Sequence, residues 1–494
     1  MKFLVIMWIA LCPLLVMASE SPPLLAEVSI STAAGFVPDT RLRPDDRTVF
    51  MAAKAVLGEG LTLREYGSSH IMGDVGGWTH PSQTLSWTVK AAESDHYAIE
   101  IVLKQVSSVP VRVEVSCAGK HLVSDIPPRG SQAWVWQRVP LAGHLEIPKG
   151  SHPVTVRALT QSGDFNLVVR SIELVRPAVR RTQTATALSM RADTTWLQQA
   201  GFGLMVTWTP DTWPRHGDRQ PYEQAVNAFD VPAFVQQVAD TGAGFVVFIT
   251  AHAHMTIPAP CQALDQILSG RTTKRDLIAE IATALEQRHI KLFLYYHMGS
   301  ASDVEWLKAT KFFATDSTTL FANWTAIIEE LGRRYGTRVS GWWFDDGMAT
   351  YSWHQAPWQQ LYQSSKVGNP QRLVGLNAYE WPMPTEFMDY NTGETPLDPA
   401  GFGWLIKGGT GIYQDGPGKG FQATFTVMAD GSDQWRHGQR DTEIGPPRWD
   451  SRQLGELLQR SADFRSVPIF NCEIYQDGSL SEKTVTTFRE ARQK

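Results

Sequence analysis

The run Phe245-Val246-Val247-Phe248-Ile249-Thr250 is one of a series of short apolar stretches in the second half of the chain. It shows no alternation of polar and apolar residues, which is typical of a parallel strand covered on both faces. Amphipathic helical patterns lie on either side of it, at 231–241 and at 274–287. The run is therefore predicted to be one strand of a sheet in which strands and helices alternate.

Seven further stretches resemble this one and complete a repeating pattern. The candidate strands are 202–207, 245–250, 291–297, 341–345, 373–377, 387–390, 421–427 and 467–471. Helical patterns also occupy 320–335, 357–365 and 451–462. Eight strands alternating with helices within 194–494 favour a (β/α)8 barrel of the TIM type. A doubly wound sheet is the alternative, and it is disfavoured because no glycine-rich phosphate loop follows the first strand.

The first part of the chain has a different period. Polar and apolar residues alternate in short segments such as 96–103, 111–115 and 166–174, with Gly and Pro between them. This pattern predicts an antiparallel, jelly-roll-like β-sandwich over 25–178. The order Tyr66, Trp78, Trp87 and Tyr97 resembles that of carbohydrate-binding jelly rolls found beside glycosidases. Residues 179–193 are polar and rich in Thr and Ala, and they are predicted to be a linker.

The composition narrows the classes of function. The chain has 494 residues, of which 50 are acidic and 45 basic, and its net charge of −5 argues against a nucleic-acid partner. Hydrophobic residues make up 43% and supply ample material for packed cores. The 18 tryptophans are explained either by large cores or by sugar recognition, because an indole face stacks on the C–H face of a pyranose.

The N-terminus predicts the compartment. Lys2 precedes an apolar run over 3–17, and the small residue Ala18 offers a cleavage site, so 1–18 is predicted to be a signal peptide of a secreted or periplasmic protein. No later stretch reaches about 18 apolar residues, and no membrane partner is expected. Cys117, Cys261 and Cys472 have no metal-binding spacing, and neither a metal nor an organic cofactor is expected.

Reactive groups in a barrel lie at the C-terminal ends of the strands. The candidate strand ends carry carboxylates, imidazoles and aromatic rings. The side chains singled out are Trp208, His252, His254, Tyr296, His297, Trp343, Asp345, Asp346, Glu380, Glu394, Gln422 and Glu473. Such a set suits a sugar, because rings stack, imidazoles and amides bond hydroxyl groups, and carboxylates act as nucleophile or acid.

Asp345 is the candidate nucleophile. It ends a strand of Trp and Phe, and a desolvated carboxylate costs several kcal/mol unless it is paired or used. Asp346 is either a helix cap or a partner of the catalytic groups. His252 and His254 lie two apart on a strand end and are expected to point the same way. Sugar binding is preferred to metal binding for them, since no third ligand has a defined spacing.

Three glutamates compete for the role of general acid. Glu394 ranks first because it follows the sixth candidate strand on the expected rim, and Glu473 ranks second because it follows the eighth strand directly. Glu380 is the third. His297 is either a sugar-binding residue or an ordinary buried histidine.

From Trp196 to the C-terminus the chain resembles the family 29 α-L-fucosidases. The motifs that carry the resemblance, in order, are Gly203-Leu204-Met205-Val206-Thr207-Trp208, Ala243-Gly244-Phe245-Val246-Val247-Phe248-Ile249-Thr250, Lys274-Arg275-Asp276-Leu277, Leu294-Tyr295-Tyr296, Gly341-Trp342-Trp343-Phe344-Asp345 and Pro468-Ile469-Phe470-Asn471. The resemblance implies a retaining glycosidase acting on oligo- or polysaccharides, with Asp345 as nucleophile.

The chain also departs from the family pattern. Its first strand ends Thr207-Trp208-Thr209 where the family has His-Trp-Gly, and its second ends Ala251-His252-Ala253-His254 where the family has Lys-His-His-Asp. The match to the family's acid segment has Gln422 in the place of Glu. These departures leave a second hypothesis from another class: a catalytically impaired pseudo-enzyme that binds glycans. The sequence does not indicate an oligomeric state.

Overall fold

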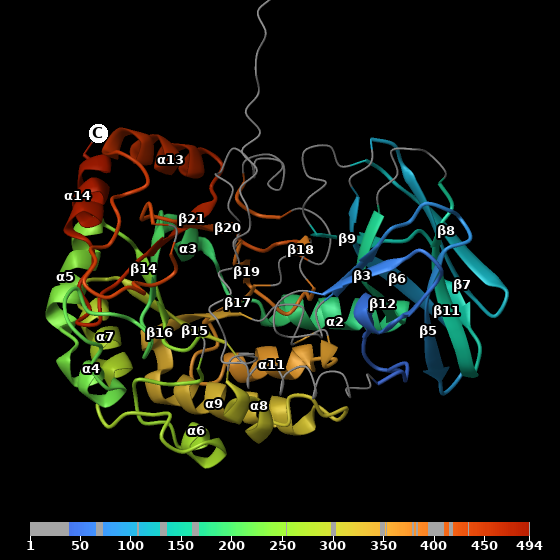
Figure 1. Ribbon diagram of the computed structural model, residues 1–494, viewed down its shortest axis with the longest axis horizontal. Coiled ribbons are helices and arrows are strands. Elements are labelled where there is room, and N and C mark those ends of the chain that lie inside the picture. The colour runs from blue at the N-terminus through green and yellow to red at the C-terminus, as the bar shows by residue number, and fades with distance from the viewer. Residues whose placement is uncertain are drawn as a thin grey trace, which may run out of the picture.

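The computed structural model describes residues 39–493 apart from 66–72, 106–107, 129–135, 161–166, 253, 298–302, 346–350, 352, 378–379, 382–383, 394–409, 414–417 and 433. The predicted signal peptide lies outside the described residues. Figure 1 shows a barrel and a β-sheet unit side by side, with helix α2 (Pro177–Met190) running between them. Among the described residues, no helix is both long and apolar enough to cross a membrane.

The N-terminal unit consists of two antiparallel sheets around one core. Its strands are β1 (Thr48–Met51), β2 (Val56–Leu57), β3 (Thr62–Glu65), β4 (Gly73–Gly76), β5 (Thr84–Ala91), β6 (Asp95–Gln105), β7 (Val111–Cys117), β8 (Lys120–Ile126), β9 (Trp136–Pro140), β10 (Leu145–Ile147), β11 (Gly150–Ala158) and β12 (Leu167–Val175). One sheet has the order β9-β6-β12-β4-β3, with β1 on β12 and β10 on β6, and the other has the order β2-β5-β11-β7-β8. Ile101 and Ile172 of the first sheet and Val113 and Val154 of the second belong to the same buried cluster. The prediction of antiparallel sheets in this part of the chain is confirmed.

The second unit is a nearly closed barrel of eight parallel strands, as predicted. Its strands are β13 (Gly203–Thr207), β14 (Phe245–Ile249), β15 (Lys291–Tyr296), β16 (Val339–Phe344), β17 (Leu373–Leu376), β19 (Tyr390–Asn391), β20 (Thr424–Met428) and β21 (Val467–Cys472). They pair in the order β19-β17-β16-β15-β14-β13-β21-β20. A parallel bridge from Tyr390 to Gln422 joins the two ends of this order, so the sheet curls back on itself.

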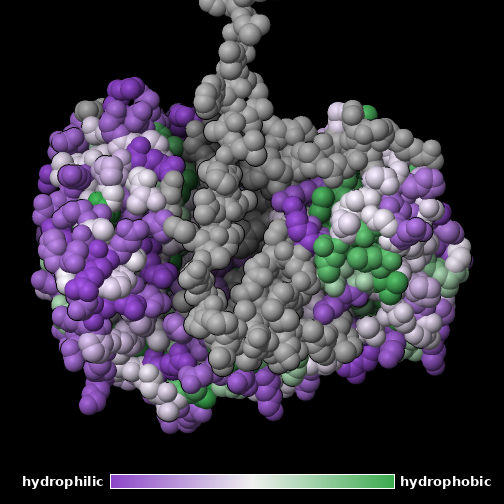
Figure 2. Space-filling model, in the orientation of Figure 1, coloured by the Kyte–Doolittle hydropathy of each residue, from purple (hydrophilic) through white to green (hydrophobic). Residues whose placement is uncertain are grey.

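Helices surround the barrel, and five of them coincide within a few residues with the helical patterns predicted from the sequence, whereas the others were not predicted. The helices are α3 (Thr195–Gln199), α4 (Tyr222–Ala228), α5 (Val231–Thr241), α6 (Gln262–Ile267), α7 (Leu277–Glu286), α8 (Val304–Ala309), α9 (Thr318–Tyr335), α11 (Trp358–Ser365), α13 (Ser451–Asp463) and α14 (Glu482–Ala491). Asp230, Asp276 and Asp450 cap α5, α7 and α13 by accepting hydrogen bonds from backbone N–H groups of the first turn. The outward faces of these helices make the barrel side of the molecule mostly hydrophilic, whereas an apolar patch lies over the β-sheet unit (Figure 2).

Aromatic rings fill the interior of the barrel where neighbouring strands carry glycine. A Cβ atom on Gly341 would lie 2.6 Å from the ring of Phe293, and one on Gly375 would lie 2.4 Å from the ring of Tyr390. Both distances are far below van der Waals contact, so these two positions exclude every other residue type. The rings and glycines together form a solid interior, and ligands can enter only at the ends of the strands.

The segment 179–193, predicted to be a linker, is mostly helical. Helix α2 begins with Pro177 at its first turn, where a missing N–H costs nothing. Only Gln183 and Ala187 of the helix are buried, which explains why no amphipathic period is visible in its sequence. Ala187 belongs to the same core cluster as Val102 and Trp136 of the sheet unit and as many residues of the barrel. The segment is therefore a packed element and not a free connection.

A buried network of ion pairs joins the two units. Arg47 contacts Glu386, which lies before β19, and its Nη1 is 3.8 Å from Glu173 of β12. Arg138 of β9 and Arg180 of α2 approach the same Glu173 at 2.8 Å and 2.6 Å. Although burial opposes ionisation, the charges of Arg47, Arg138 and Arg180 lower the pKa of Glu173 to about 2. Each carboxylate is thus matched by arginine, and the network fixes the sheets against the barrel.

A short strand makes a second link. After β17 the chain forms β18 (Glu380–Trp381), which pairs in parallel with Trp136 and Gln137 of β9 (Figure 1). A loop of the barrel thereby becomes the edge strand of the first N-terminal sheet. The two units are thus joined both by buried charges and by backbone pairing, and on β9 the paired residues Trp136 and Gln137 directly precede Arg138 of the ion network.

We expect Arg47→Met to destabilise the whole protein. The substitution leaves Glu173 and Glu386 buried, each about 2% exposed, without one of their cations. Removing one partner of a buried ion pair costs about 3–5 kcal/mol. The free energy of unfolding from chemical denaturation measures the effect. Arg452→Met is the control, because Arg452 and Glu456 form an exposed pair on α13 that contributes about 0.5 kcal/mol. Equal effects of the two substitutions would contradict the structural role of the network.

Candidate active site

Asp345 lies at the C-terminal end of β16 and points into the mouth of the barrel. The alternation along β16 sends Gly341, Trp343 and Asp345 to the interior and Trp342 to the helix layer. Tyr295 Oη donates a hydrogen bond of 2.5 Å to Asp345 Oδ2, and Asn377 Nδ2 donates one of 3.0 Å to Oδ1. Both donors stabilise the ionised carboxylate and fix its orientation, and the side chain is 7% exposed. A carboxylate held from two sides at the end of a packed strand is suited to a chemical role.

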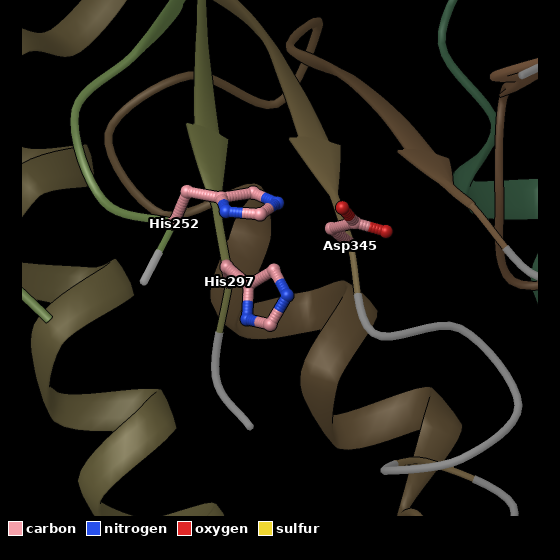
Figure 3. Close-up of side chains that lie close together, drawn as sticks. All are labelled: His252, His297 and Asp345. Carbon is pink, nitrogen blue, oxygen red and sulfur yellow. The ribbon is translucent and has the colours of Figure 1, made fainter. Parts of the chain in front are cut away.

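Two histidines face this carboxylate. His252 follows β14 and His297 follows β15, so the three side chains come from consecutive strands (Figure 3). One nitrogen of each imidazole and one carboxylate oxygen lie within 4.8 Å of one another, and the centres of the imidazole rings are 5.3 Å apart in an edge-to-face arrangement. His252 is exposed and His297 half-buried, so the group is open to solvent on one side.

These three side chains are also a possible metal site, because two imidazoles and a carboxylate are a common zinc ligand set. In a tetrahedral zinc site the ligand atoms are about 3.3 Å apart, given bonds of about 2.0–2.1 Å. The observed spacing extends to 4.8 Å, and both oxygens of Asp345 already accept hydrogen bonds. This spacing suits hydroxyl groups of a ligand lying between the side chains better than a single ion.

Several residues predicted for the site lie elsewhere. Trp208 is 1% exposed and packs in the layer between barrel and helices, where its ring meets those of Phe229 and Phe248. Tyr296 is buried in the same layer against Trp324. Both side chains were expected to bind substrate. They belong to the core instead, because the alternation along each strand directs them outward, toward the helices.

Trp343 and His254 also differ from the expectation. Trp343 does face the barrel interior, but it is 1% exposed and stacks on Tyr295 at 5.2 Å, one layer beneath Asp345. It therefore supports the site from below. His254 does not join His252: its Nδ1 is 4.0 Å from a carboxylate oxygen of Asp303, at the start of α8. The chain leaves the strand conformation before these histidines, and the expected common direction is lost.

The position of Gln422 differs most clearly from the one expected from the sequence. It lies before β20, at the N-terminal end of the strand, and its amide donates to the backbone carbonyl of Arg465 before β21. This is the end of the barrel opposite Asp345. Gln422 therefore does not stand in the place of an acid, and the sequence match that put it there was wrong.

Two predicted residues, Asp346 and Glu394, lie outside the described residues, and the side chain of Glu380 does too. Glu473 is described. It follows β21 on the same rim as Asp345, is 2% exposed, accepts a hydrogen bond from Ser432 and lies 3.6 Å from Nδ1 of His437. Its own backbone N–H donates to Asp430.

Asp430 forms a carboxyl pair with Glu473 that the sequence analysis missed. Burial raises the pKa of Asp430 to about 7, hydrogen bonds from Thr484 and the Glu473 backbone oppose the shift, and the charge of Glu473 adds to it.

Tyr295 and Asn377 were also not predicted as site residues. The phase of β15 would have found Tyr295, because it lies two positions before His297 on one face.

We expect the stability of the protein to fall as pH rises from about 4 to about 7, in part because of Asp430. Over this window the folded state holds a proton that the unfolded state has lost. Asp430→Asn removes this dependence, so the variant gains on the order of 2–4 kcal/mol relative to the wild type between pH 4 and pH 8. Unfolding curves of both proteins across this range measure the difference, and parallel curves would contradict the assignment.

Comparison with known protein families finds one match, which covers part of the barrel. A family model described as Alpha-L-fucosidase matches residues 218–395, which include Asp345, His252 and His297. No curated protein matches the chain. Among solved structures, alpha-L-fucosidase AlfC from Lactobacillus casei in complex with its alpha-L-fucose product is 15% identical, covers 61% of this chain and 97% of its own, and has a TM-score of 0.43.

The endo-fucoidan hydrolase MfFcnA9 of glycoside hydrolase family 107 is 13% identical, covers 63% of each chain and has a TM-score of 0.46. The assignment rests on the family model, since the structural likenesses are low. Residues 218–395 match the model of the alpha-L-fucosidase family, and this match supports a glycosidase.

Proposed function

We propose that the protein is a secreted glycoside hydrolase that releases an α-L-fucosyl-type sugar by a retaining mechanism, with Asp345 as the nucleophile. The observation that carries the proposal is the carboxylate of Asp345, fixed by Tyr295 and Asn377 and faced by two imidazoles at the mouth of the barrel. Such an arrangement supplies the nucleophile and the hydroxyl-binding groups that a glycosidase requires. The apolar N-terminal run and Ala18 support secretion.

In the first step a carboxylate oxygen of Asp345 attacks the anomeric carbon, and the bond from that carbon to the leaving oxygen breaks. A general acid gives its proton to the leaving oxygen. In the second step the same residue takes a proton from water, which attacks the glycosyl-enzyme and frees Asp345. The hydrogen bonds from Tyr295 and Asn377 stabilise the carboxylate as it leaves in this step.

His252 and His297 are proposed to bind hydroxyl groups of the sugar. One ring nitrogen of each histidine lies within 4.8 Å of an oxygen of the Asp345 carboxylate, so a sugar whose anomeric carbon meets Asp345 has its hydroxyl groups near both rings. Imidazole can both donate and accept a hydrogen bond, so either nitrogen can serve a hydroxyl group. Trp208 and Tyr296 are buried in the core and cannot contact a sugar. Among the described candidates, the two histidines therefore remain for this binding role.

The general acid is proposed to be Glu394 or Glu473. A retaining glycosidase has its two carboxyl groups about 5–5.5 Å apart. Glu473 shares the rim with Asp345, but it comes from β21, four strands away from β16 in the sheet order, and is covered by the segment that carries Ser432 and His437. In the sequence Glu394 follows β19. That strand lies two positions from β16 in the sheet order, on the side opposite β15. The alternative of a glycan-binding pseudo-enzyme loses the support that came from Gln422, because Gln422 does not lie at the acid position, and keeps only the departures at the ends of the first two strands.

The N-terminal sheets are proposed to assist glycan binding. Their position beside the barrel, with β18 as a shared strand, gives a long substrate a second surface near the mouth. No single tryptophan identifies that surface: Trp78 is 3% exposed and Trp136 is 5% exposed, so both lie mostly in packed surroundings.

We expect Asp345→Gly to lower kcat on an aryl α-L-fucoside by on the order of 10³-fold or more, because the covalent route disappears. Added azide should partly restore turnover by entering the vacated space as an external nucleophile. Asp345→Asn is the matched control, since it keeps the volume and should show no rescue. Near-normal activity of Asp345→Gly would move the nucleophile to Asp346 or end the retaining mechanism.

Leaving-group dependence identifies the acid. Protonation matters most when the leaving group is poor, so substitution of the true acid harms unactivated glycosides far more than aryl glycosides. We expect Glu394→Gln to show this asymmetry, by about 10²-fold, with Glu473→Gln as the second choice. Initial rates on a fucosyl disaccharide and on a nitrophenyl fucoside give the ratio. Absence of the asymmetry in both variants would mean that neither residue is the acid.

A further inference from the structure

A tryptophan outside the site of Asp345 packs against the interior of the barrel. Trp435 belongs to the segment 429–448 between β20 and α13, which the structure describes apart from residue 433. Its side chain contacts the cluster that fills the barrel, to which Tyr295 and Trp343 also belong. The side chain is only half-buried, so part of the indole surface stays open after this packing.

Two side chains of the neighbouring strand hold this segment at the catalytic end of the barrel. Asn471 lies near the C-terminal end of β21, and its Nδ2 donates to the backbone carbonyls of Gln434 and Trp435, at 3.2 Å each. Just beyond the strand, Glu473 accepts a hydrogen bond from Ser432. Because both anchors lie at the end of β21 that reaches the catalytic rim, Trp435 meets the barrel interior at the mouth and not at the opposite end.

The strand that holds Trp435 is opposite the strand that carries Asp345. The bridge from Tyr390 to Gln422 joins the two ends of the sheet, so the eight strands form a ring. From β16, strand β21 is four steps away in either direction, through β15, β14 and β13 or through β17, β19 and β20. The interior of an eight-stranded barrel is just wide enough for side chains to fill it. The indole and the carboxylate therefore lie on opposite sides of a narrow opening.

The proposed reaction has a direction across this opening. In a displacement at the anomeric carbon, the attacking carboxylate and the leaving oxygen are on opposite faces of that carbon. His252 and His297 lie on the β16 side, close to Asp345, where the sugar that stays on the enzyme is bound. The group that leaves departs from the face turned away from Asp345. It is thus directed toward β21 and the open part of the indole.

We propose that Trp435 is the platform for the leaving group, on which the ring of the departing sugar stacks while Asp345 attacks. An indole face packs on the C–H face of a pyranose as well as on an aryl ring, so the contact favours leaving groups that contain a ring. Asn471 and Ser432 are positioning residues, because their hydrogen bonds hold the backbone that carries the indole. The platform deepens the proposed function and rests on it for the bond that is cleaved.

A substrate without a ring in its leaving group tests the platform. Fucosyl fluoride and nitrophenyl fucoside deliver the same sugar to Asp345, but only the second has a leaving group that can stack. We expect Trp435→Ala to lower kcat/KM on the nitrophenyl fucoside about tenfold and to keep kcat/KM on the fluoride within about twofold of the wild type. Hydrolysis of the glycosyl-enzyme no longer involves the leaving group, so kcat should stay unchanged wherever that second step limits the rate.

Further variants assign the effect to the ring and to its position. Trp435→Phe keeps an aromatic face and should retain most of the activity on the nitrophenyl fucoside. Ser432→Ala loosens the segment without touching the ring, and it should show the same loss to a smaller degree. Ser432→Ala also keeps the test available if thermal unfolding shows that Trp435→Ala is not folded.

A tryptophan at the other end of the barrel is the matched control. Trp196 is also half-buried and packs against the same interior cluster, but it comes from α3, before the first barrel strand. Any loss of activity in Trp196→Ala should therefore be the same on the fluoride and on the nitrophenyl fucoside.

A third substrate separates the platform from the general acid. Loss of an acid harms a fucosyl disaccharide and largely spares the nitrophenyl fucoside, whose leaving group needs little protonation. Loss of the platform harms both of these and spares the fluoride. Trp435→Ala should therefore lower kcat/KM on the disaccharide and on the nitrophenyl fucoside to a similar extent.

The pattern over the three substrates decides the outcome. Equal loss on the fluoride and on the nitrophenyl fucoside in Trp435→Ala would overturn the platform, because the ring would then act on the retained sugar or on folding alone. Unchanged rates on all three substrates would overturn it as well. A wild type that cleaves none of them would overturn the proposed function, and the platform with it.

Discussion

The filling of the barrel by aromatic rings is the constraint on which the rest of the structure depends. Phe245, Phe293 and Tyr390 occupy the interior only because Gly203, Gly341 and Gly375 leave them room. A solid interior blocks the channel along the axis, so the two ends of the barrel have different tasks. The ends of the strands after β14, β15 and β16 bring His252, His297 and Asp345 together, and the opposite end carries the packing contacts of Gln422.

The sequence allowed the barrel and its chief carboxylate to be predicted, because both leave a local signal. Apolar runs mark the strands, and Asp345 stands out as a charge at the end of a run of Trp and Phe. Side-chain direction was harder to predict, since it depends on the phase of each strand. Tyr296 was chosen over Tyr295, and Gln422 was placed on the wrong rim because the motif match was given more weight than its position at the start of the predicted strand 421–427.

Other features leave no local signal at all. Helix α2 buries only two residues, so its sequence resembles a polar connection. The ion network joins Arg47 to Glu386 across 339 positions of the chain, and the pairing of β18 with β9 joins Glu380 to Trp136, 380 − 136 = 244 positions apart. Each of these contacts is formed by tertiary packing, which periodicity in a single stretch does not encode. The carboxyl pair of Asp430 and Glu473 belongs to the same class.

The strand β18 has a consequence for how such a protein can change over evolutionary time. An accessory domain on a flexible tether can be gained, lost or exchanged without disturbing the enzyme that carries it. Here the loop that leaves Asn377 at the reactive carboxylate becomes, three residues later, an edge of the neighbouring sheet. A replacement of that sheet would have to reproduce its edge in the same place. The two units are therefore inherited as one piece, and diversity in what the protein recognises has to arise from side chains on a shared surface and not from the shuffling of modules.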